Sequence, residues 1–292
     1  MTWLLIGGSG QLGCALQKEL RRRTISYKSF SSLDLDISNV LEVEAAFAHF
    51  VPDVVVNAAA WTDVEAAELN PERSYQINAL GALNIARAAK RLNSVFVQIS
   101  TDYVFSGSNF NQPWDEEAFK RPISVYGYTK SEGETLVQSL GMNSLYILRT
   151  AWLYSADRKN FVKTMVNLAL NSDQRVNVVN DQLGQPTFAG DLGKQTINLV
   201  LSKSQYGIYH GTNSSEATWY EFAQEIFKLI GADVSRVVPC LTSDFRMQAK
   251  RPHYSVLGHK SWANTTVSPM RDWRIALNEA MPAIISSVKT GK

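Results

Sequence analysis

The chain has 292 residues, of which 45% are hydrophobic and 19% charged, a composition typical of a globular protein with a large core. Its formal net charge is +2, so no overall field favours nucleic acid or a membrane surface, and a local arrangement of groups must meet any anionic ligand. Two cysteines, Cys14 and Cys240, are too few for a disulfide scaffold, and neither a signal peptide nor an apolar run of membrane-spanning length is visible, so we expect a cytoplasmic protein.

Apolar strands alternate with amphipathic helices along the first half of the chain. The expected strands are residues 2–8, 25–30, 52–60, 94–101 and 144–154. Helical patterns occupy 11–23, 40–50 with Ser38 as its cap, 71–93, and the segment around Tyr126. This alternation predicts an α/β fold of the Rossmann type, a doubly wound parallel sheet that binds ligands at the carboxyl ends of its strands.

A glycine-rich turn joins the first expected strand to the first expected helix. The sequence IGGSGQLG places Gly7, Gly10 and Gly13 three residues apart, where the lack of a side chain allows a tight turn and close approach of a pyrophosphate. The following helix offers free N–H groups and the positive end of its dipole. The pattern predicts a dinucleotide-binding turn, and the alternative is a turn that only connects two elements.

The end of the second expected strand indicates which dinucleotide binds. No carboxylate follows residues 25–30 directly to bond a ribose diol. The polar side chains at that end are Lys28, Ser29, Ser31 and Ser32. Because lysine and serine can accept a 2′-phosphate, the sequence favours NADPH. Asp34 or Asp36 could still reach the ribose, so NADH stays possible.

Two later strand ends carry further candidates. Residues 57–60 are Asn-Ala-Ala-Ala, whose small side chains leave room for a cofactor or else serve close helix–strand packing. Thr101 and Asp102 follow the strand at 94–101. The hydroxyl could bond a substrate carbonyl oxygen, whereas Asp102 could instead cap a turn. Since parallel strands end at one edge of a sheet, we expect these groups to converge.

A tyrosine and a lysine stand four residues apart in VYGYTKSEGE. Tyr126 and Lys130 therefore share one face of a helix, while Tyr128 points elsewhere. A nearby ammonium lowers the pKa of a phenol, which is about 10 in water. The pair is a candidate general acid/base, although the same spacing also arises by chance on surface helices.

The order of these motifs resembles the extended short-chain dehydrogenase/reductase family. Within it, five ordered blocks look like the dTDP-4-dehydrorhamnose reductases: NAAAWTDVEAAE, STDYVFSG, VYGYTKSEGE, LRTAWLY and VVNDQLGQPT. The tail RPHYSVLGHKSW keeps the Arg-Pro and serine character of that family's C-terminal part. The likeness covers essentially the whole chain. It implies an NADPH-dependent oxidoreductase that reduces the C4 keto group of dTDP-4-dehydrorhamnose, giving dTDP-L-rhamnose for cell-wall polysaccharide.

The resemblance also implies roles for particular residues. Tyr126 would donate a proton to the developing alkoxide, Lys130 would hold the nicotinamide ribose, and Thr101, where most relatives have serine, would bond the keto oxygen. The implied cofactor-binding residues are Gly7, Gly10, Gln11, Leu12, Gly13, Asp36, Ile37, Ala58, Ala59, Ala60, Ile99, Tyr126 and Lys130. The implied substrate-binding residues are Trp61, Thr62, Thr101, Asp102, Tyr126 and Trp152.

One departure from the resemblance concerns a metal. Some bacterial relatives dimerise around a magnesium ion held by glutamates, but the corresponding positions here are Ala15 and the pair 189–190, with only Asp191 nearby. A hard divalent cation needs several oxygen ligands. We therefore expect no metal, and a monomer or a metal-independent oligomer.

The expected organisation has two domains. Residues 1–150 with about 187–214 would form the Rossmann domain, and about 151–186 with 215–292 a smaller C-terminal α/β substrate domain. In the latter, 180–187 is expected as a loop, and 218–230 as an amphipathic helix that stops at Gly231. The candidates for holding the substrate's diphosphate are Lys163, Arg246, Lys250 and Arg251.

Two other functions fit parts of the sequence. Another nucleotide-sugar reductase, an epimerase or a dehydratase of the same family would use the same scaffold. A 4,6-dehydratase is expected to carry a glutamate after Asp102, where this chain has Tyr103. A non-catalytic NADP-binding regulatory subunit would tend to lose the tyrosine or the lysine of the pair, and both are present.

Overall fold

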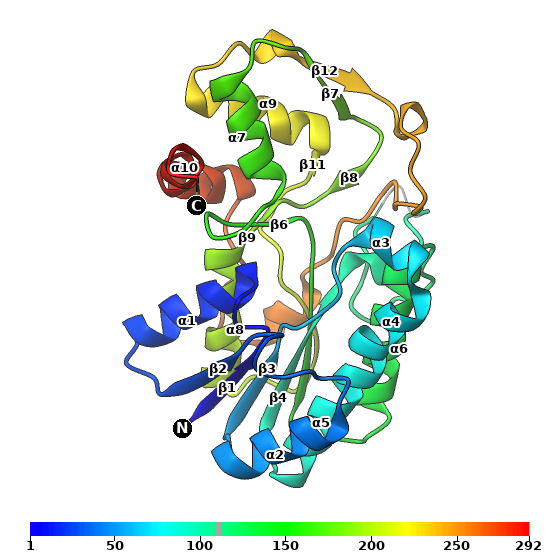
Figure 1. Cartoon of the computed structure of the whole chain (residues 1–292), viewed down its shortest axis with the longest axis vertical. Coiled ribbons are helices and arrows are strands. Elements are labelled where there is room, and N and C mark those ends of the chain that lie inside the picture. Colours follow the sequence, from blue (N-terminus) through cyan, green and yellow to red (C-terminus); the bar gives the residue numbers. More distant parts are fainter. Residues whose placement is uncertain (109–111, 292) are drawn as a thin grey trace.

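The main feature of the molecule is a six-stranded sheet in which all neighbouring strands are parallel. The computed structural model describes residues 1–108 and 112–291. In sheet order the strands are β10 (Gly207–His210), β5 (Leu145–Thr150), β4 (Val95–Thr101), β3 (Val54–Asn57), β1 (Trp3–Ile6) and β2 (Tyr27–Phe30). This order confirms the doubly wound Rossmann-type fold (Figure 1).

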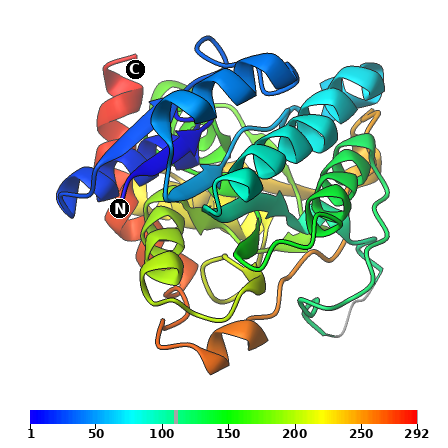
Figure 2. The ribbon, with the colours of Figure 1, turned by 90° about the horizontal axis from the view of Figure 1, so that it is seen from below.

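Helices cover both faces of this sheet (Figure 2). They are α1 (Gln11–Arg22), α2 (Val40–Phe50), α3 (Val64–Leu69), α4 (Pro71–Tyr75), the π-helical turn η1 (Gln76–Gly81), α5 (Ala82–Arg91), α6 (Val125–Gln138) and α8 (Ala189–Leu201). Successive residues of a strand point to opposite faces. In β1, Trp3 and Leu5 therefore pack in the core with α1 and α8, while Leu4 and Ile6 pack in the core with α2 and α5.

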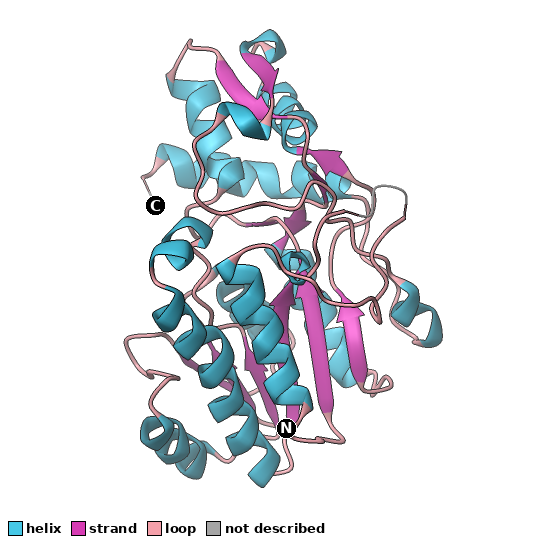
Figure 3. Ribbon diagram, turned by 90° about the vertical axis from the view of Figure 1, so that its right-hand side faces the viewer, coloured by secondary structure: helices cyan, strands magenta, loops and turns pink. Residues whose placement is uncertain are grey.

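A second lobe lies beyond the carboxyl ends of the sheet strands (Figures 1 and 3). Its elements are β6 (Leu153–Tyr154), α7 (Phe161–Asn171), β7 (Val176–Val179), β8 (Leu183–Gly184), β9 (Thr187–Phe188), β11 (Ala217–Thr218), α9 (Trp219–Ile230), β12 (Val237–Cys240) and α10 (Trp273–Lys289). Phe222, Phe227 and Trp273 are fully buried in its core. In the part of the chain that the structure describes, no helix has the length and apolar character needed to span a bilayer.

Two local predictions are wrong. Asn39, not Ser38, caps α2, since its side chain accepts hydrogen bonds from the backbone nitrogens of Leu41 and Glu42. Segment 180–187, expected as a loop, contains β8 and the start of β9, which pair with β11 and β6. Pro186 has no N–H to donate, so it separates these two short strands.

We propose that the two lobes correspond to the two domains expected from the sequence, except for the segment at about 260–270. As expected, α8 and β10, which come late in the chain, belong to the lobe of the main sheet. Trp262, Val267 and Met270 also pack in the core beneath α1 and α8, so the chain returns to the sheet between about 260 and 270 before it enters α10.

Candidate active site

The site residues expected from the sequence line one cleft at the carboxyl ends of the strands. It consists of two adjoining cavities that share Ser9, Gly10, Ala58 and Ala60. The first cavity, called here the α6 part, also contains Gln11, Leu12, Gly13, Thr62, Ile99, Thr101, Asp102, Tyr126, Lys130 and Trp152. The second, the β2 part, also contains Gly7, Asp36, Ile37, Ala59 and Trp61. Trp61, expected on the substrate, thus lies in the β2 part with Asp36 and Ile37.

The glycine turn leaves room for a ligand. Gly7 has φ of +83°, and a Cβ there would lie 2.6 Å from the backbone nitrogen of Ala59, so the chain itself requires this glycine. At Gly10 an added Cβ would meet only the oxygen of Gly7, at 3.3 Å. The open space at Gly10 adjoins the N-terminus of α1, where N–H groups lack partners within the helix. These residues fit a dinucleotide whose pyrophosphate approaches the backbone.

Strand β4 and helix α6 bring the reactive side chains together. The Thr101 hydroxyl, at the end of β4, accepts a hydrogen bond from the backbone nitrogen of Tyr103 (3.2 Å) and donates one to Asp102 Oδ1 (2.9 Å). From α6, Lys130 Nζ donates to the carbonyl oxygen of Ile99 in β4, at 2.7 Å. The Ile99–Lys130 hydrogen bond therefore fixes the helix that carries Tyr126 against the strand that carries Thr101.

The phenol of Tyr126 is set as a proton donor. Burial and the charge of Asp102 raise its pKa to about 12, and a hydrogen bond with Thr101 opposes this rise only in part. The expected lowering of this pKa by Lys130 is not found. The Lys130 ammonium turns to Ile99, and burial lowers its own pKa to about 8. At neutral pH the phenol therefore carries the proton that a general acid needs, but the raised pKa also makes that proton harder to release than in water.

Asp102 is a buried carboxyl beside these groups. Burial raises its pKa to about 6, although hydrogen bonding with Ser255 and Thr101 acts in the opposite direction. The turn-capping role considered for Asp102 belongs to Thr101, which is the N-cap of the short 3₁₀ turn Asp102–Val104. Ser255 comes from the C-terminal part of the chain, so that part contacts a carboxyl that lines the cleft.

Trp152 lies in the α6 part of the cleft in a strained conformation. Its φ of +45° falls in the left-handed region, which a bulky residue rarely adopts. Its ring stacks on that of Trp219, with centroids 3.6 Å apart and planes 10° apart. Backbone strain of this kind is typical of functional sites. Trp219 also lines the cleft and was not expected there from the sequence, where it is only one residue of the amphipathic helix expected at 218–230.

In the β2 part of the cleft, serines rather than carboxylates stand at the end of the strand. Ser31 and Ser32 line this part, as expected. Lys28 does not, because its ammonium lies over the rings of Phe30 and Phe50, 5.7 and 5.5 Å from their centroids. The hydroxyl of Ser29 faces Gly8 of the turn. Of the four polar residues expected near a 2′-phosphate, Ser31 and Ser32 therefore line the cleft, whereas Lys28 and Ser29 do not.

The two aspartates that could compete for the ribose are both bonded within the chain. Asp34 accepts hydrogen bonds from the backbone nitrogen and hydroxyl of Ser31, at 2.8 and 2.6 Å. Asp36 accepts from Ser38 at 2.9 and 2.6 Å and pairs with Arg73 at 3.4 Å. Arg73 also lines the cleft, which adds a cation beside Asp36.

The four basic residues expected near the diphosphate line neither part of the cleft. Lys163 Nζ donates to the carbonyl oxygen of Ala156 at 3.2 Å, and Arg251 pairs with Glu65 at 2.7 Å. The basic residues of the α6 part besides Lys130 are Arg158 and Lys159. In the sequence, Arg158 and Lys159 stand out only as two adjacent basic residues between the expected strand at 144–154 and α7.

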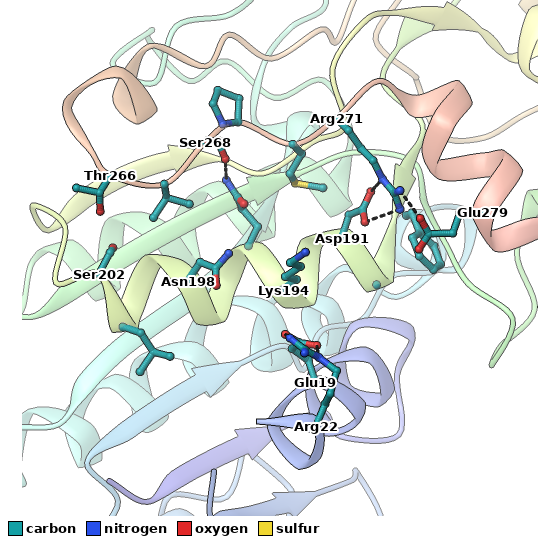
Figure 4. A pocket seen from close by; sticks show the side chains of 17 residues that line it. Glu19, Arg22, Asp191, Lys194, Asn198, Ser202, Thr266, Ser268, Arg271 and Glu279 are labelled. Carbon is teal, nitrogen blue, oxygen red and sulfur yellow. Dashed lines mark hydrogen bonds and ion pairs between the residues drawn. The ribbon is translucent and has the colours of Figure 1, made fainter. Parts of the chain in front are cut away.

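Of the positions that would correspond to a metal site, Gly190 and Asp191 line a separate pocket, between α1, α8 and segment 266–271 (Figure 4). Asp191 accepts two hydrogen bonds from Arg271, at 2.8 and 2.9 Å, and one from Asn213, at 2.9 Å. Arg271 also pairs with Glu279, and Glu19 on α1 pairs with Arg22 at 2.7 Å. Within residues 1–108 and 112–291, no group of three or more potential His, Cys, Asp or Glu ligands is assembled for a metal.

We therefore predict that chelation leaves the assembly of the protein unchanged. Arg271 already supplies the positive charge that Asp191 would otherwise need, and Ala15 offers no oxygen. Light scattering with and without chelator, in the absence of substrate, measures this directly. A dimer that dissociates on chelation and reforms with magnesium would contradict the prediction. The substrate must be left out, because magnesium can also bind its diphosphate.

Comparison with known proteins gives the family. Residues 1–285 match the family model described as RmlD substrate binding domain. The chain is 41% identical over 286 residues to a dTDP-4-dehydrorhamnose reductase of Streptomyces griseus, covering 97% of this chain and 93% of that protein. A dTDP-4-dehydrorhamnose reductase structure from Clostridium acetobutylicum has a TM-score of 0.92 at 43% identity, covering 97% and 99% of the two chains. One from Bacillus anthracis, in complex with NADP, has a TM-score of 0.91 at 36% identity, covering 96% and 98%.

The sheet, the glycine turn and the cleft define a Rossmann-type dinucleotide-binding protein. With these comparisons, the chain belongs to the RmlD family, that of the dTDP-4-dehydrorhamnose reductases. The resemblance expected from the motifs is confirmed.

Proposed function

We propose that the protein reduces the C4 keto group of dTDP-4-dehydrorhamnose, using NADPH, to give dTDP-L-rhamnose. The observation that carries the proposal is the cleft that joins the glycine turn to Thr101, Tyr126 and Lys130. A hydroxyl, a protonated phenol and a buried ammonium beside a dinucleotide turn suit the reduction of a carbonyl group. When bound, NADPH supplies the hydride.

In this proposal each residue of the trio has a separate task. The Thr101 hydroxyl turns from Asp102 to donate a hydrogen bond to the keto oxygen, and so orients it toward the phenol. Tyr126 protonates that oxygen as negative charge develops on it, and its raised pKa ensures that the proton is present. Lys130, held by Ile99, keeps a positive charge near the nicotinamide ribose. Asp102, Trp152 and Thr62 form the wall against which the sugar nucleotide lies.

The test is incubation with NADPH and dTDP-4-dehydrorhamnose, followed by nicotinamide absorbance. Loss of absorbance with formation of dTDP-L-rhamnose supports the proposal. Conversion of a nucleotide sugar without net oxidation of the cofactor would point to an epimerase or dehydratase. Cofactor binding without turnover of any such sugar would point to a regulatory subunit. We further propose that the protein works in the cytoplasm, where its free Cys14 and Cys240 stay reduced.

We predict that kcat/KM is higher with NADPH than with NADH. Ser31 and Ser32 line the cleft where a ribose-binding carboxylate would otherwise stand, and Arg73 adds a cation there. Asp34 and Asp36 are bonded to Ser31 and Ser38. Steady-state kinetics with the two cofactors at a fixed substrate concentration decide the question. A clear advantage for NADH would mean that one of these aspartates turns to the ribose.

A further inference from the structure

Residues 155–160, called here the strap, cross from the second lobe to the glycine turn. Three side-chain contacts hold the strap to this turn and to α1. Ser155 Oγ and Asn160 Nδ2 both donate to Gln11 Oε1, at 3.1 and 3.0 Å. Asp157 forms an ion pair with Lys18 of α1, at 2.7 Å. The strap therefore keeps a fixed position over the cofactor side of the cleft.

Arg158 is the residue of the strap that lies over the turn itself. Its Nε donates to the carbonyl oxygen of Ser9 at 2.6 Å, and the side chain lines the α6 part of the cleft together with Ser9 and Gly10. Arg149, Arg251 and Arg271 all pair with carboxylates. Among the described residues Arg158 forms no such ion pair, so the rest of its guanidinium is available to an anion.

We propose that Arg158 binds the diphosphate of the dinucleotide cofactor. This inference rests on the proposed function, because it needs NADPH to occupy the turn. The turn itself offers backbone N–H groups and the end of a helix dipole but no full charge. A planar guanidinium suits two phosphate oxygens at once and remains charged at all relevant pH values. Arg158 would add the missing charge from the opposite lobe and tie the strap to the bound cofactor.

A dTDP-sugar also carries a diphosphate, so the same guanidinium could in principle bind the substrate. Position favours the cofactor, because Arg158 bonds Ser9, which lies inside the glycine turn and lines both parts of the cleft. The experiment has to separate these two diphosphates.

The test is isothermal titration calorimetry of the full chain with NADPH alone and with dTDP alone. We expect Arg158→Gln to weaken NADPH binding by roughly 10-fold or more, the usual size of a charge-assisted phosphate contact. Arg158→Lys should fall between this variant and the wild type, since it keeps the charge but not the fork. Arg175→Gln is the matched control, because Arg175 is also exposed in the second lobe but lines neither part of the cleft.

The outcomes separate this inference from the proposed function. A wild-type protein that does not bind NADPH contradicts both. A wild type that binds and reduces as proposed, with Arg158→Gln binding NADPH equally well, overturns only the role of Arg158. Weakened binding of dTDP with unchanged binding of NADPH would assign Arg158 to the substrate and overturn the inference as stated. Arg158 is exposed, so neither substitution is expected to prevent folding.

Discussion

Tyr126→Phe is expected to lower turnover by roughly 10²–10⁴-fold, the usual contribution of a positioned general acid. The substitution removes only the phenolic oxygen, so the ring and its edge contact with Tyr103, 5.5 Å between centroids, are kept. Thr101 does not replace this proton, because in the proposed mechanism its hydroxyl has the separate task of bonding the keto oxygen. Steady-state kinetics with saturating NADPH measure the loss, and cofactor binding should change little.

Tyr128→Phe is the matched control for this prediction. Tyr128 lies on the same helix two residues away, but 52% of its surface is exposed and it lines the groove near Pro122 instead of the cleft. Its turnover should stay close to that of the wild type. If the two variants lose activity equally, the assignment of Tyr126 as the acid is wrong.

The cleft was largely predictable because it is built from strand ends. The expected residues at the ends of β1, β3 and β4 lie together for a topological reason: parallel neighbours end at one edge. The helical spacing of Tyr126 and Lys130 likewise follows from the geometry of one element. The position of Thr101 therefore follows from the end of one strand.

The parts that the sequence did not reveal depend on contacts between distant segments. Arg158 and Trp219 reach the cleft from the second lobe, and Ser255 of the C-terminal part bonds Asp102 at its edge. The packing of these segments has no local signature in the sequence. The pKa of Tyr126 was predicted in the wrong direction for a similar reason. Spacing along a helix shows which charges are near, but the extent of burial, which dominates here, depends on the whole fold.

A buried ion cluster one turn beyond Lys130 anchors the catalytic helix. Glu134 of α6 is fully buried and accepts two hydrogen bonds from Arg149 of β5, at 2.9 and 2.8 Å. Lys120 lies 3.4 Å from the same carboxylate. Burial alone would raise the pKa of Glu134, but Arg149 and Lys120 outweigh it and lower the pKa. The carboxylate is therefore ionised and fixes α6 to the sheet.

Glu134→Gln is expected to lower the free energy of unfolding by about 3–5 kcal/mol, because it leaves the charge of Arg149 buried without its counter-ion. Chemical denaturation followed by circular dichroism measures the change. Glu44→Gln is the matched control: Glu44 pairs with Arg91 at 3.1 Å, but both side chains are about half exposed, so the cost should stay within about 1 kcal/mol.

The double variant Glu134→Leu/Arg149→Met tests the physical reason for this loss. It removes both charges and replaces them with apolar side chains, so it should recover much of the stability that Glu134→Gln loses. If Glu134→Gln is no less stable than Glu44→Gln, the cluster does not anchor α6. Helix α6 carries both Tyr126 and Lys130, and the charge of Glu134 raises the pKa of Lys130. The double variant should therefore still lose activity even where it regains stability. Stability and turnover would then separate, because the fold needs only that the fully buried Arg149 is not left unpaired and Lys120 is partly exposed, whereas Lys130 loses the carboxylate that raises its pKa.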